Sequence, residues 1–204
     1  MLRIIESRSP RESDNLFILL HGYGSDERDL MGLAPYFGST WRTVCLGAPN
    51  AHPSMGYAWF DLDWSEEKGL TANLDQARET LELVNEAVTA QLKTRPAHAI
   101  IGGFSQGAMM ALAACAQMPK NWNGLALLSG RALPIVEISQ PLPPTIIQHG
   151  TTDPVIPLED AHELRDLVMN SGTLVEYHEY AMGHQISEKS LHDLQAWLHR
   201  RTIA

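Results

Sequence analysis

The most reactive feature of the sequence is a serine framed by two glycines. Gly103, Ser105 and Gly107 form a G-x-S-x-G pattern between an apolar run and a stretch rich in alanine and methionine. On a tight strand-to-helix turn such a serine presents its hydroxyl clear of the sheet, and the glycines avoid collisions with the neighbouring strand and helix. The pattern therefore predicts a nucleophile at Ser105. The alternative is a glycine-rich turn that only joins a strand to a helix.

A serine hydroxyl needs a base, and the base needs a group that orients it. Where such a serine elbow stands on an α/β sheet, the three residues follow one another as serine, acid and histidine. Asp153 lies beyond Ser105, after an apolar run and before Pro154, where it could alternatively serve only to form the turn. Among nine histidines, His184 alone combines a loop position, a preceding glycine and the expected place in this order. We therefore expect Ser105, Asp153 and His184 to form a catalytic triad.

Acyl transfer also needs backbone donors for the negative charge of a tetrahedral intermediate. The residue after the nucleophile, Gln106, can supply one N–H group, and the loop after an early strand supplies the other. Residues 21–24 (HGYG) fit that loop, and Tyr23 N–H is the expected donor. The alternative for this segment is a plain glycine turn. Losing one such donor typically costs about 10²–10³ in rate.

These residues require a scaffold that ends several strands at one edge of a sheet. Short apolar runs alternate with amphipathic segments along the chain, which predicts an α/β fold over a single domain, residues 1–204. We expect the α/β-hydrolase fold, with a mainly parallel central sheet, helices on both faces and no large cap domain. We expect residues 50–69 to form an excursion over the sheet edge. The expected strands are 16–20, 43–46, 98–102, 125–128, 145–148 and 174–180, and the expected helices are 74–92, 105–117, 158–170 and 187–200.

Composition restricts the partners and cofactors. The 204 residues carry a formal net charge of −9, which repels nucleic acid and anionic lipid surfaces but leaves an anionic small substrate open. Cys45 and Cys115 are expected to be buried free thiols. No metal-ligand spacing occurs, so we expect no metal and no other cofactor. Without a signal-peptide core or an apolar run of roughly 20 residues, we expect a cytoplasmic protein, with a homodimer left open.

Several segments together resemble the phospholipase/carboxylesterase family of α/β hydrolases, which includes acyl-protein thioesterases. They occur in the family's order and cover nearly the whole chain. The resemblance implies the triad Ser105–Asp153–His184 and an oxyanion hole near Tyr23 and Gln106. One departure is that Ser25 stands where many relatives carry an acid, and Asp26 follows it. The matching segments are 20–24 (LHGYG), 57–61 (YAWFD), 102–108 (GGFSQGA), 149–155 (HGTTDPV) and 183–184 (GH).

The expected reaction is hydrolysis of short- to medium-chain carboxylic esters through an acyl-enzyme. Acyl-protein thioesterase or lysophospholipase activity on longer chains is an alternative, and so is a non-catalytic binding module that keeps the fold. A serine peptidase ranks lower because the chain leaves little room for a cap or propeller. Apolar residues that could hold the acyl group, or could instead be ordinary core residues, are Met55, Tyr57, Trp59, Phe60 and Met182.

Overall fold

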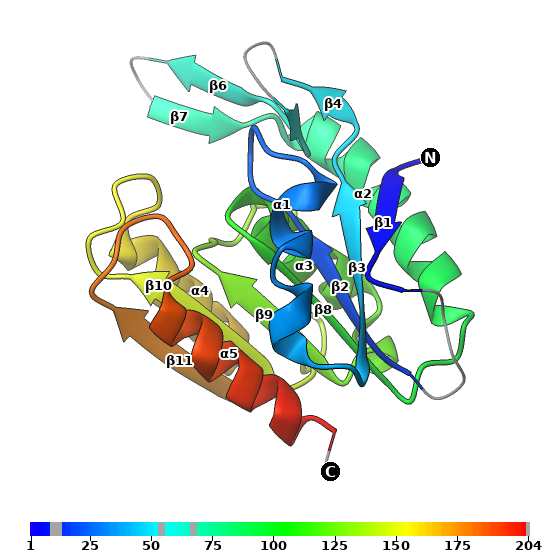
Figure 1. Ribbon diagram of the computed structural model, residues 1–204. Helices are drawn as coiled ribbons and strands as arrows, with labels where there is room; N and C mark the ends of the chain where they lie inside the picture. The colour runs from blue at the N-terminus through cyan, green and yellow to red at the C-terminus, as the bar shows by residue number, and fades with distance from the viewer. Residues whose placement is uncertain (9–13, 53–55, 66–68, 203–204) are drawn as a thin grey trace.

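The computed structural model describes residues 1–8, 14–52, 56–65 and 69–202. A seven-stranded sheet forms its centre (Figure 1). The first strand of the spatial order is antiparallel to its neighbour, and every other neighbouring pair is parallel. In spatial order the strands are β1 (Arg3–Glu6), β3 (Trp41–Gly47), β2 (Asn15–Leu20), β8 (His98–Phe104), β9 (Gly124–Leu128), β10 (Thr145–Gly150) and β11 (Val175–Tyr180).

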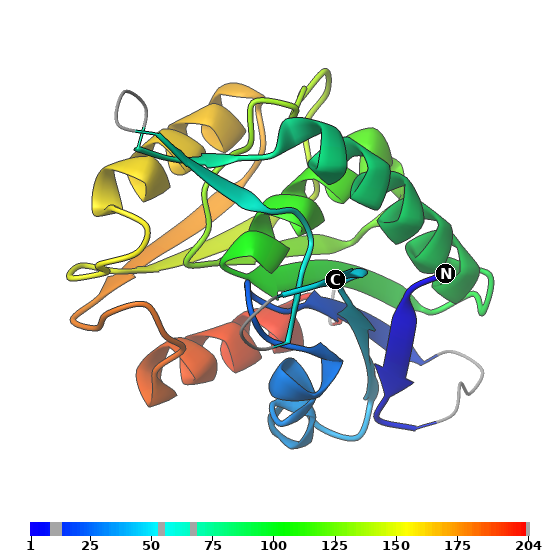
Figure 2. The same cartoon turned by 90° about the horizontal axis from the view of Figure 1, so that it is seen from above.

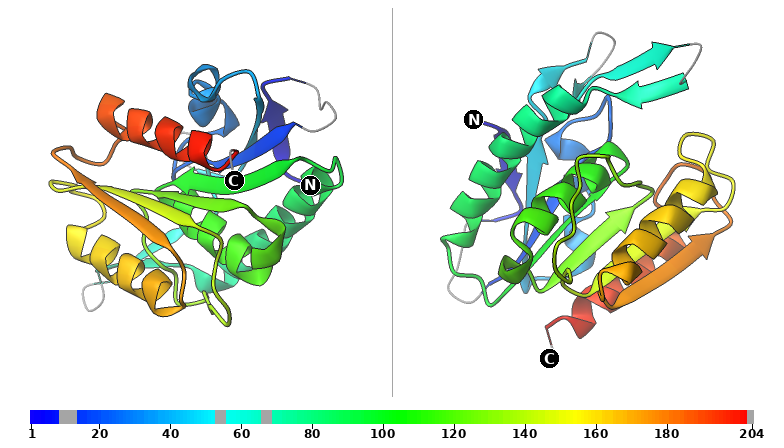
Figure 3. Two further views of the ribbon diagram at one scale, coloured as in Figure 1. Left: turned by 90° about the horizontal axis from the view of Figure 1, so that it is seen from below. Right: turned by 180° about the vertical axis from the view of Figure 1, so that it is seen from behind.

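Helices cover both faces of this sheet, as expected. On one face lie α2 (Leu74–Leu92), α3 (Gln106–Gln117) and α4 (Leu158–Asn170), which Figure 3 shows side by side in its right-hand view. On the other lie the short α1 (Glu27–Met31) and α5 (Glu188–Arg200), seen below the sheet in Figure 2. The expected α/β-hydrolase fold, with a mostly parallel sheet between two layers of helices, is thus confirmed, and the described residues include no large cap domain.

Strand β2 shows why its sequence requires two covered faces. All six of its residues are buried, and successive side chains point to opposite faces of a sheet. Leu16, Ile18 and Leu20 join the apolar cluster that contains residues of α2, α3 and α4. Phe17 and Leu19 join the second cluster, which contains residues of α1 and α5. A continuous apolar run is therefore what a central parallel strand needs.

Several elements were not predicted. β1 has the alternating pattern of a half-buried edge strand, but its four residues are recognisable only through pairing with β3. Residues 50–72 contain two small hairpin-like sheets, β4 (Asn50–Ala51) with β5 (Tyr57–Ala58) and β6 (Leu62–Ser65) with β7 (Gly69–Ala72). In Figure 1 these strands lie beyond the carboxyl ends of the central strands.

The two cysteines are buried free thiols, as predicted. Cys45 lies in β3, and burial raises the pKa of its thiol to about 12. Cys115 lies in α3, and burial raises its pKa further. Both side chains therefore stay protonated and act as small apolar groups.

Candidate active site

The serine elbow lies between β8 and α3. Ser105 has φ 55° and ψ −120°, in the left-handed region that non-glycine residues rarely adopt. A Cβ atom at Gly107 would lie 2.0 Å from the Leu20 carbonyl oxygen, and one at Gly103 would lie 2.4 Å from the Gly107 carbonyl carbon. The backbone segments touch here, so only glycine fits. Ser105 N donates to Leu128 O at 2.8 Å and fixes the turn to β9.

A continuous line of hydrogen bonds joins the three residues expected to form the triad. The Nδ1 atom of His184 lies 2.7 Å from Asp153 Oδ2, and its Nε2 atom lies 2.8 Å from Ser105 Oγ. A carboxylate only accepts hydrogen bonds, so Nδ1 carries the proton and Nε2 of the neutral ring accepts from the serine hydroxyl. The arrangement leaves Nε2 free to take the serine proton.

The acid turn holds Asp153 through its other oxygen. Asp153 Oδ1 accepts hydrogen bonds from Val155 N at 2.8 Å and Ile156 N at 3.0 Å, while its side chain is fully buried. Burial favours the neutral carboxyl, but the amides and the His184 contact outweigh it and lower the pKa of Asp153. The sequence left open whether Asp153 forms the turn or contacts the histidine. In the structure Oδ1 forms the turn and Oδ2 contacts His184, so Asp153 does both.

His149 packs against the same turn. Its side chain is fully buried, and its Nε2 donates to Ile156 O at 2.9 Å and lies 3.5 Å from Asp153 Oδ2. His149 thus helps to hold the geometry of this turn. Its Nδ1 atom has no hydrogen-bond partner within the described part of the chain.

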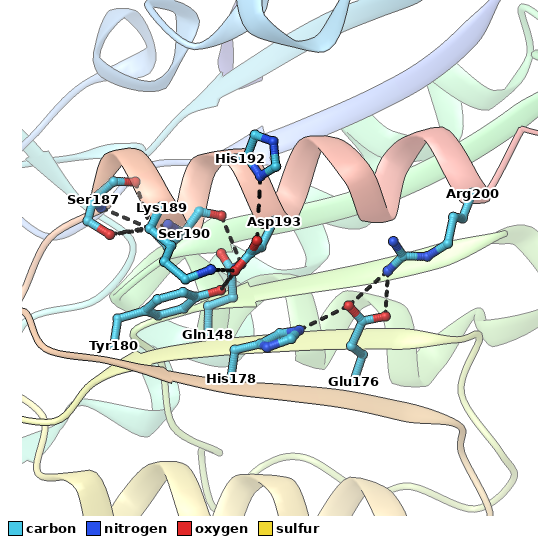
Figure 4. A network of polar contacts seen from close by, with 10 residues as sticks. All are labelled: Gln148, Glu176, His178, Tyr180, Ser187, Lys189, Ser190, His192, Asp193 and Arg200. Carbon is cyan, nitrogen blue, oxygen red and sulfur yellow. Dashed lines mark hydrogen bonds and ion pairs between the residues drawn. The ribbon is translucent and has the colours of Figure 1, made fainter.

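His184 lies in the loop between β11 and α5, with its ring centroid 4.8 Å from that of Phe104. A polar network anchors both ends of this loop (Figure 4). Gln148 Nε2 donates to the hydroxyl of Tyr180, which in turn donates to Asp193 Oδ2 on α5. Ser187 caps α5 by accepting from Ser190 N at 3.2 Å. The loop therefore spans two fixed points, which restricts where His184 can lie.

The loop expected to supply an oxyanion donor lies against the elbow. A Cβ atom at Gly22 would lie 3.4 Å from Ser105 Cβ, so this segment passes directly beside the nucleophile. Tyr23 and Gln106 both line the cavity at Ser105. Among the described residues, neither backbone N–H donates to a protein acceptor.

A buried network fixes this loop to the elbow. His21 Nδ1 donates to Gly22 O at 2.7 Å, and His21 Nε2 accepts from Ala48 N at 3.0 Å. Burial lowers the pKa of His21 and favours its neutral ring, which alone can accept this bond. Trp59 Nε1 donates to His21 O at 2.8 Å. The His21 side chain thus helps to hold the geometry of this loop.

The side chain of Gln106 completes this network. Its Oε1 accepts from Trp59 N at 2.8 Å, and its Nε2 donates to Phe60 O at 2.7 Å. Gln106 therefore clamps the aromatic segment to the start of α3 while its backbone N–H stays available. The sequence reasoning considered only the backbone of this residue.

The departure at Ser25 and Asp26 has a local explanation. Ser25 Oγ donates to Asp29 Oδ2 at 2.8 Å, and Asp26 Oδ1 accepts from Arg28 N at 2.8 Å. Asp26 is thus the N-cap of α1. The loop keeps a polar anchor without an acid directly after Gly24.

A cavity of about 340 Å³ adjoins Ser105. Ser105, His184, Tyr23, Gln106 and Arg131 supply its polar lining. Its apolar wall consists of Phe60, Leu62, Phe104, Met109, Val155 and Ile156.

Of the residues suggested for acyl binding that lie in the described part of the chain, only Phe60 lines this cavity. Trp59 is fully buried in the core, and Tyr57 packs under Arg3, whose guanidinium carbon lies 3.3 Å from the ring centroid. Met182 is buried, and its carbonyl oxygen accepts from Thr152 N. Met55 lies outside the described residues. Tyr57, Trp59 and Met182 thus belong to packing around the site, which was the alternative considered for them.

Sequence reasoning missed most of the wall. Met109 and Arg131 follow the carboxyl ends of β8 and β9, and Val155 and Ile156 follow β10. Their common signal is position after a strand, since the carboxyl ends of parallel strands meet at one edge. Leu62, in β6, offers no such signal.

Neither a membrane-spanning helix nor a metal site is found among the described residues. No helix there is long and apolar enough to cross a bilayer. No group of three or more His, Cys, Asp or Glu side chains in that part of the chain is placed to hold a metal ion. The cytoplasmic location stays a prediction, and the homodimer stays open.

Comparison with known proteins places this site in a known class. The chain is 27% identical to acyl-protein thioesterase 1 of Kluyveromyces lactis, over 97% of this chain and 95% of that protein. It is 28% identical to carboxylesterase SOBER1 of Arabidopsis thaliana, over 71% of this chain and 68% of that protein. The crystal structure of esterase PE8 superposes with a TM-score of 0.86 at 27% identity, covering 98% of both chains.

The fold and its relatives define a serine hydrolase of the class that acts on ester bonds. More particularly, the chain belongs to the phospholipase/carboxylesterase family, whose model matches residues 2–201. The resemblance noted from the sequence is thus confirmed.

Proposed function

We propose that this chain hydrolyses short- to medium-chain carboxylic esters through an acyl-enzyme on Ser105. The observation that carries the proposal is the hydrogen-bonded line from Ser105 Oγ through His184 to the buried Asp153 carboxylate. These residues lie beside a cavity with an apolar wall, where an acyl group can be buried away from water. Serine, base and orienting acid are the parts that covalent acyl transfer needs.

The first half-reaction follows from this geometry. Ser105 Oγ attacks the ester carbonyl carbon while His184 Nε2 takes its proton. Asp153 holds the ring in the required tautomer and stabilises the imidazolium. The tetrahedral intermediate then expels the alcohol, which receives the proton from His184, and the acyl group stays on Ser105.

The second half-reaction repeats these roles with water. His184 takes a proton from water, which attacks the acyl carbon, and Ser105 leaves with that proton. In both steps we assign the oxyanion to the backbone N–H groups of Tyr23 and Gln106. The available amides beside Ser105 support this assignment, and the α3 N-terminus adds a favourable dipole at Gln106.

The size of the cavity supports short to medium acyl chains. At about 340 Å³ it lies near the small end of ligand pockets. A second candidate is thioester hydrolysis, favoured by the match to a relative named acyl-protein thioesterase 1. Both reactions use the same acyl-enzyme and differ only in the leaving atom.

The test is a series of acyl chain lengths presented as 4-nitrophenyl esters and as thioesters. We expect a burst of nitrophenol equal to the enzyme concentration under conditions where deacylation limits turnover. We expect kcat/KM for the esters to peak at short or medium chains. A thioester peak at long chains would favour the second candidate, and absence of hydrolysis throughout would contradict both.

A further inference from the structure

One lining residue of the cavity has no part in the reaction described so far. Arg131 follows β9, three residues after Leu128, at the carboxyl edge of the sheet. The residue before it, Gly130, packs so closely on α3 that a Cβ atom there would lie 2.7 Å from Ala108 Cβ. This close packing fixes the backbone of Arg131 beside the elbow.

Arg131 gives the cavity its charge. Of the described residues that line it, Arg131 is the only lysine, arginine, aspartate or glutamate. The rest of the wall away from the reacting groups is apolar. A purely apolar acyl chain forms no hydrogen bond with a guanidinium, whereas a carboxylate can accept two parallel N–H bonds from it.

The guanidinium is only partly occupied by the protein. Among the described residues its one polar partner is Asp160, with 3.5 Å between Nη1 and Oδ2, at the long limit of a hydrogen bond. Arginine has five N–H donors in a fixed fork, so this contact leaves most of them available. The side chain is 36% exposed and also lines a neighbouring cavity that includes Thr71 and Leu74.

A second cavity beside His184 offers a separate place for the leaving group. It shares Phe104 and His184 with the first, but its charged lining residue is Asp29. His184 must protonate the leaving group, and because His184 lines both cavities we place the leaving group in this second one. The cavity at Arg131, which contains Ser105 and the proposed oxyanion donors, is left for the acyl group.

We propose that Arg131 is a specificity-determining residue that binds a carboxylate at the far end of the acyl group. The preferred substrates would then be monoesters or monothioesters of dicarboxylic acids. This inference rests on the proposed function and narrows its substrate class. The contact is made by a side chain that touches the acyl group and not the reacting atoms.

The test compares acyl groups of one shape and different charge. Mono-4-nitrophenyl adipate carries a terminal carboxylate, and 4-nitrophenyl 6-methylheptanoate replaces it with an uncharged isopropyl group. The readout is kcat/KM for the adipate ester divided by kcat/KM for the 6-methylheptanoate ester, each after subtraction of the rate with Ser105→Ala. We expect Arg131→Met to lower this ratio about tenfold or more, because a charge-assisted hydrogen bond is lost.

Three further variants sharpen the result. Arg131→Lys keeps the charge and should retain part of the preference, while Asp160→Asn removes the competing carboxylate and should raise the ratio. Arg165→Met is the matched control, because it removes the same charge from a similarly half-exposed arginine that pairs with Asp166. We expect that control to leave the ratio unchanged.

A 4-carboxyphenyl ester of 6-methylheptanoic acid moves the charge to the leaving group. If Arg131→Met lowers kcat/KM for that ester and spares the adipate, the assignment to the acyl side is wrong. If the adipate ratio moves no more than in Arg165→Met while neutral esters are still cleaved, the carboxylate site is wrong and the proposed function stands. If no ester is cleaved and Ser105 does not react with an acylating probe, the proposed function itself fails.

Discussion

The serine elbow follows β8 and the acid turn follows β10, the two strands on either side of β9, yet they hold their side chains in opposite ways. The elbow depends on close packing of the backbone, since Ser105 adopts a strained φ of 55° and the backbone around Gly107 leaves no room for a side chain. The acid turn relies on hydrogen bonds, since Asp153 receives two backbone amides and the His184 ring, with His149 packed beside it. The first depends on sterics and the second on charge.

This difference predicts which kind of change should disrupt each region. Added volume should disrupt the elbow at any pH, because strain is tolerated only where surrounding contacts determine the backbone. Loss of the Asp153 charge, by substitution or by protonation at low pH, should weaken the turn. The turn's backbone should stay in place, because a side-chain oxygen at position 153 still accepts from the amides of Val155 and Ile156. The predictions below test this contrast.

The largest effect is expected from removing the nucleophile without changing the elbow's packing. Ser105→Ala should lower kcat by about 10⁶, as in other serine triads, while the protein stays folded. Steady-state kinetics and circular dichroism on the same preparation measure both. A loss of less than 100-fold would mean that another group carries the reaction.

The acid turn is tested by removing its charge and keeping its shape. Asp153→Asn can still accept from the amides of Val155 and Ile156, but it no longer fixes the tautomer of His184. By analogy with serine triads, kcat should fall by about 10⁴, while the protein stays folded with a melting temperature lowered by only a few degrees. Activity within tenfold of wild type would show that the carboxylate is not needed.

The elbow is tested by adding a methyl group. Gly107→Ala would place a Cβ atom 2.0 Å from Leu20 O, so we expect a loss of about 3 kcal/mol or more in the free energy of unfolding. Gly183→Ala is the control beside His184, because its Cβ atom would meet nothing closer than 3.8 Å. The control should stay within about 1 kcal/mol of wild type. Equal urea midpoints for the two variants would overturn the steric account.

The smallest effect is the pH dependence of the acid turn. The lowered pKa of Asp153 means that its folded state prefers the carboxylate. The resulting stability is fully present above the unfolded value of about 3.9 and is lost as pH falls through the lower folded value. The difference in urea midpoint between wild type and Asp153→Asn should therefore shrink on acidification from pH 6 to pH 3. A constant or growing difference would contradict this assignment.

The sequence indicated the main architecture because strand and helix periods are local. The bounds of α2 and α4 agree with the prediction, and the serine elbow is recognisable from the spacing of Gly103 and Gly107. β1 was missed because an edge strand of four residues is defined by its partner β3. The five residues of α1 are too few for a helical period.

Prediction of the candidate site from the sequence has the same limit, because contacts that form only on packing leave no local signal. Ser105, Asp153 and His184 each follow a strand, so their meeting at one sheet edge could be anticipated from chain order. The cavity wall could be anticipated only as positions that follow strands, because which side chains line it depends on how they turn after packing. Trp59 turns inward to donate to His21 O, and Arg131 reaches the cavity only because β9 lies beside β8.

The most direct test of the central claim is covalent labelling by a fluorophosphonate probe, read by intact mass and peptide mapping. The account predicts one probe per chain, attached to Ser105, with labelling abolished in Ser105→Ala and slowed in Asp153→Asn. Folded protein that stays unlabelled, or that is labelled at another residue, would contradict the role of Ser105 as the activated nucleophile.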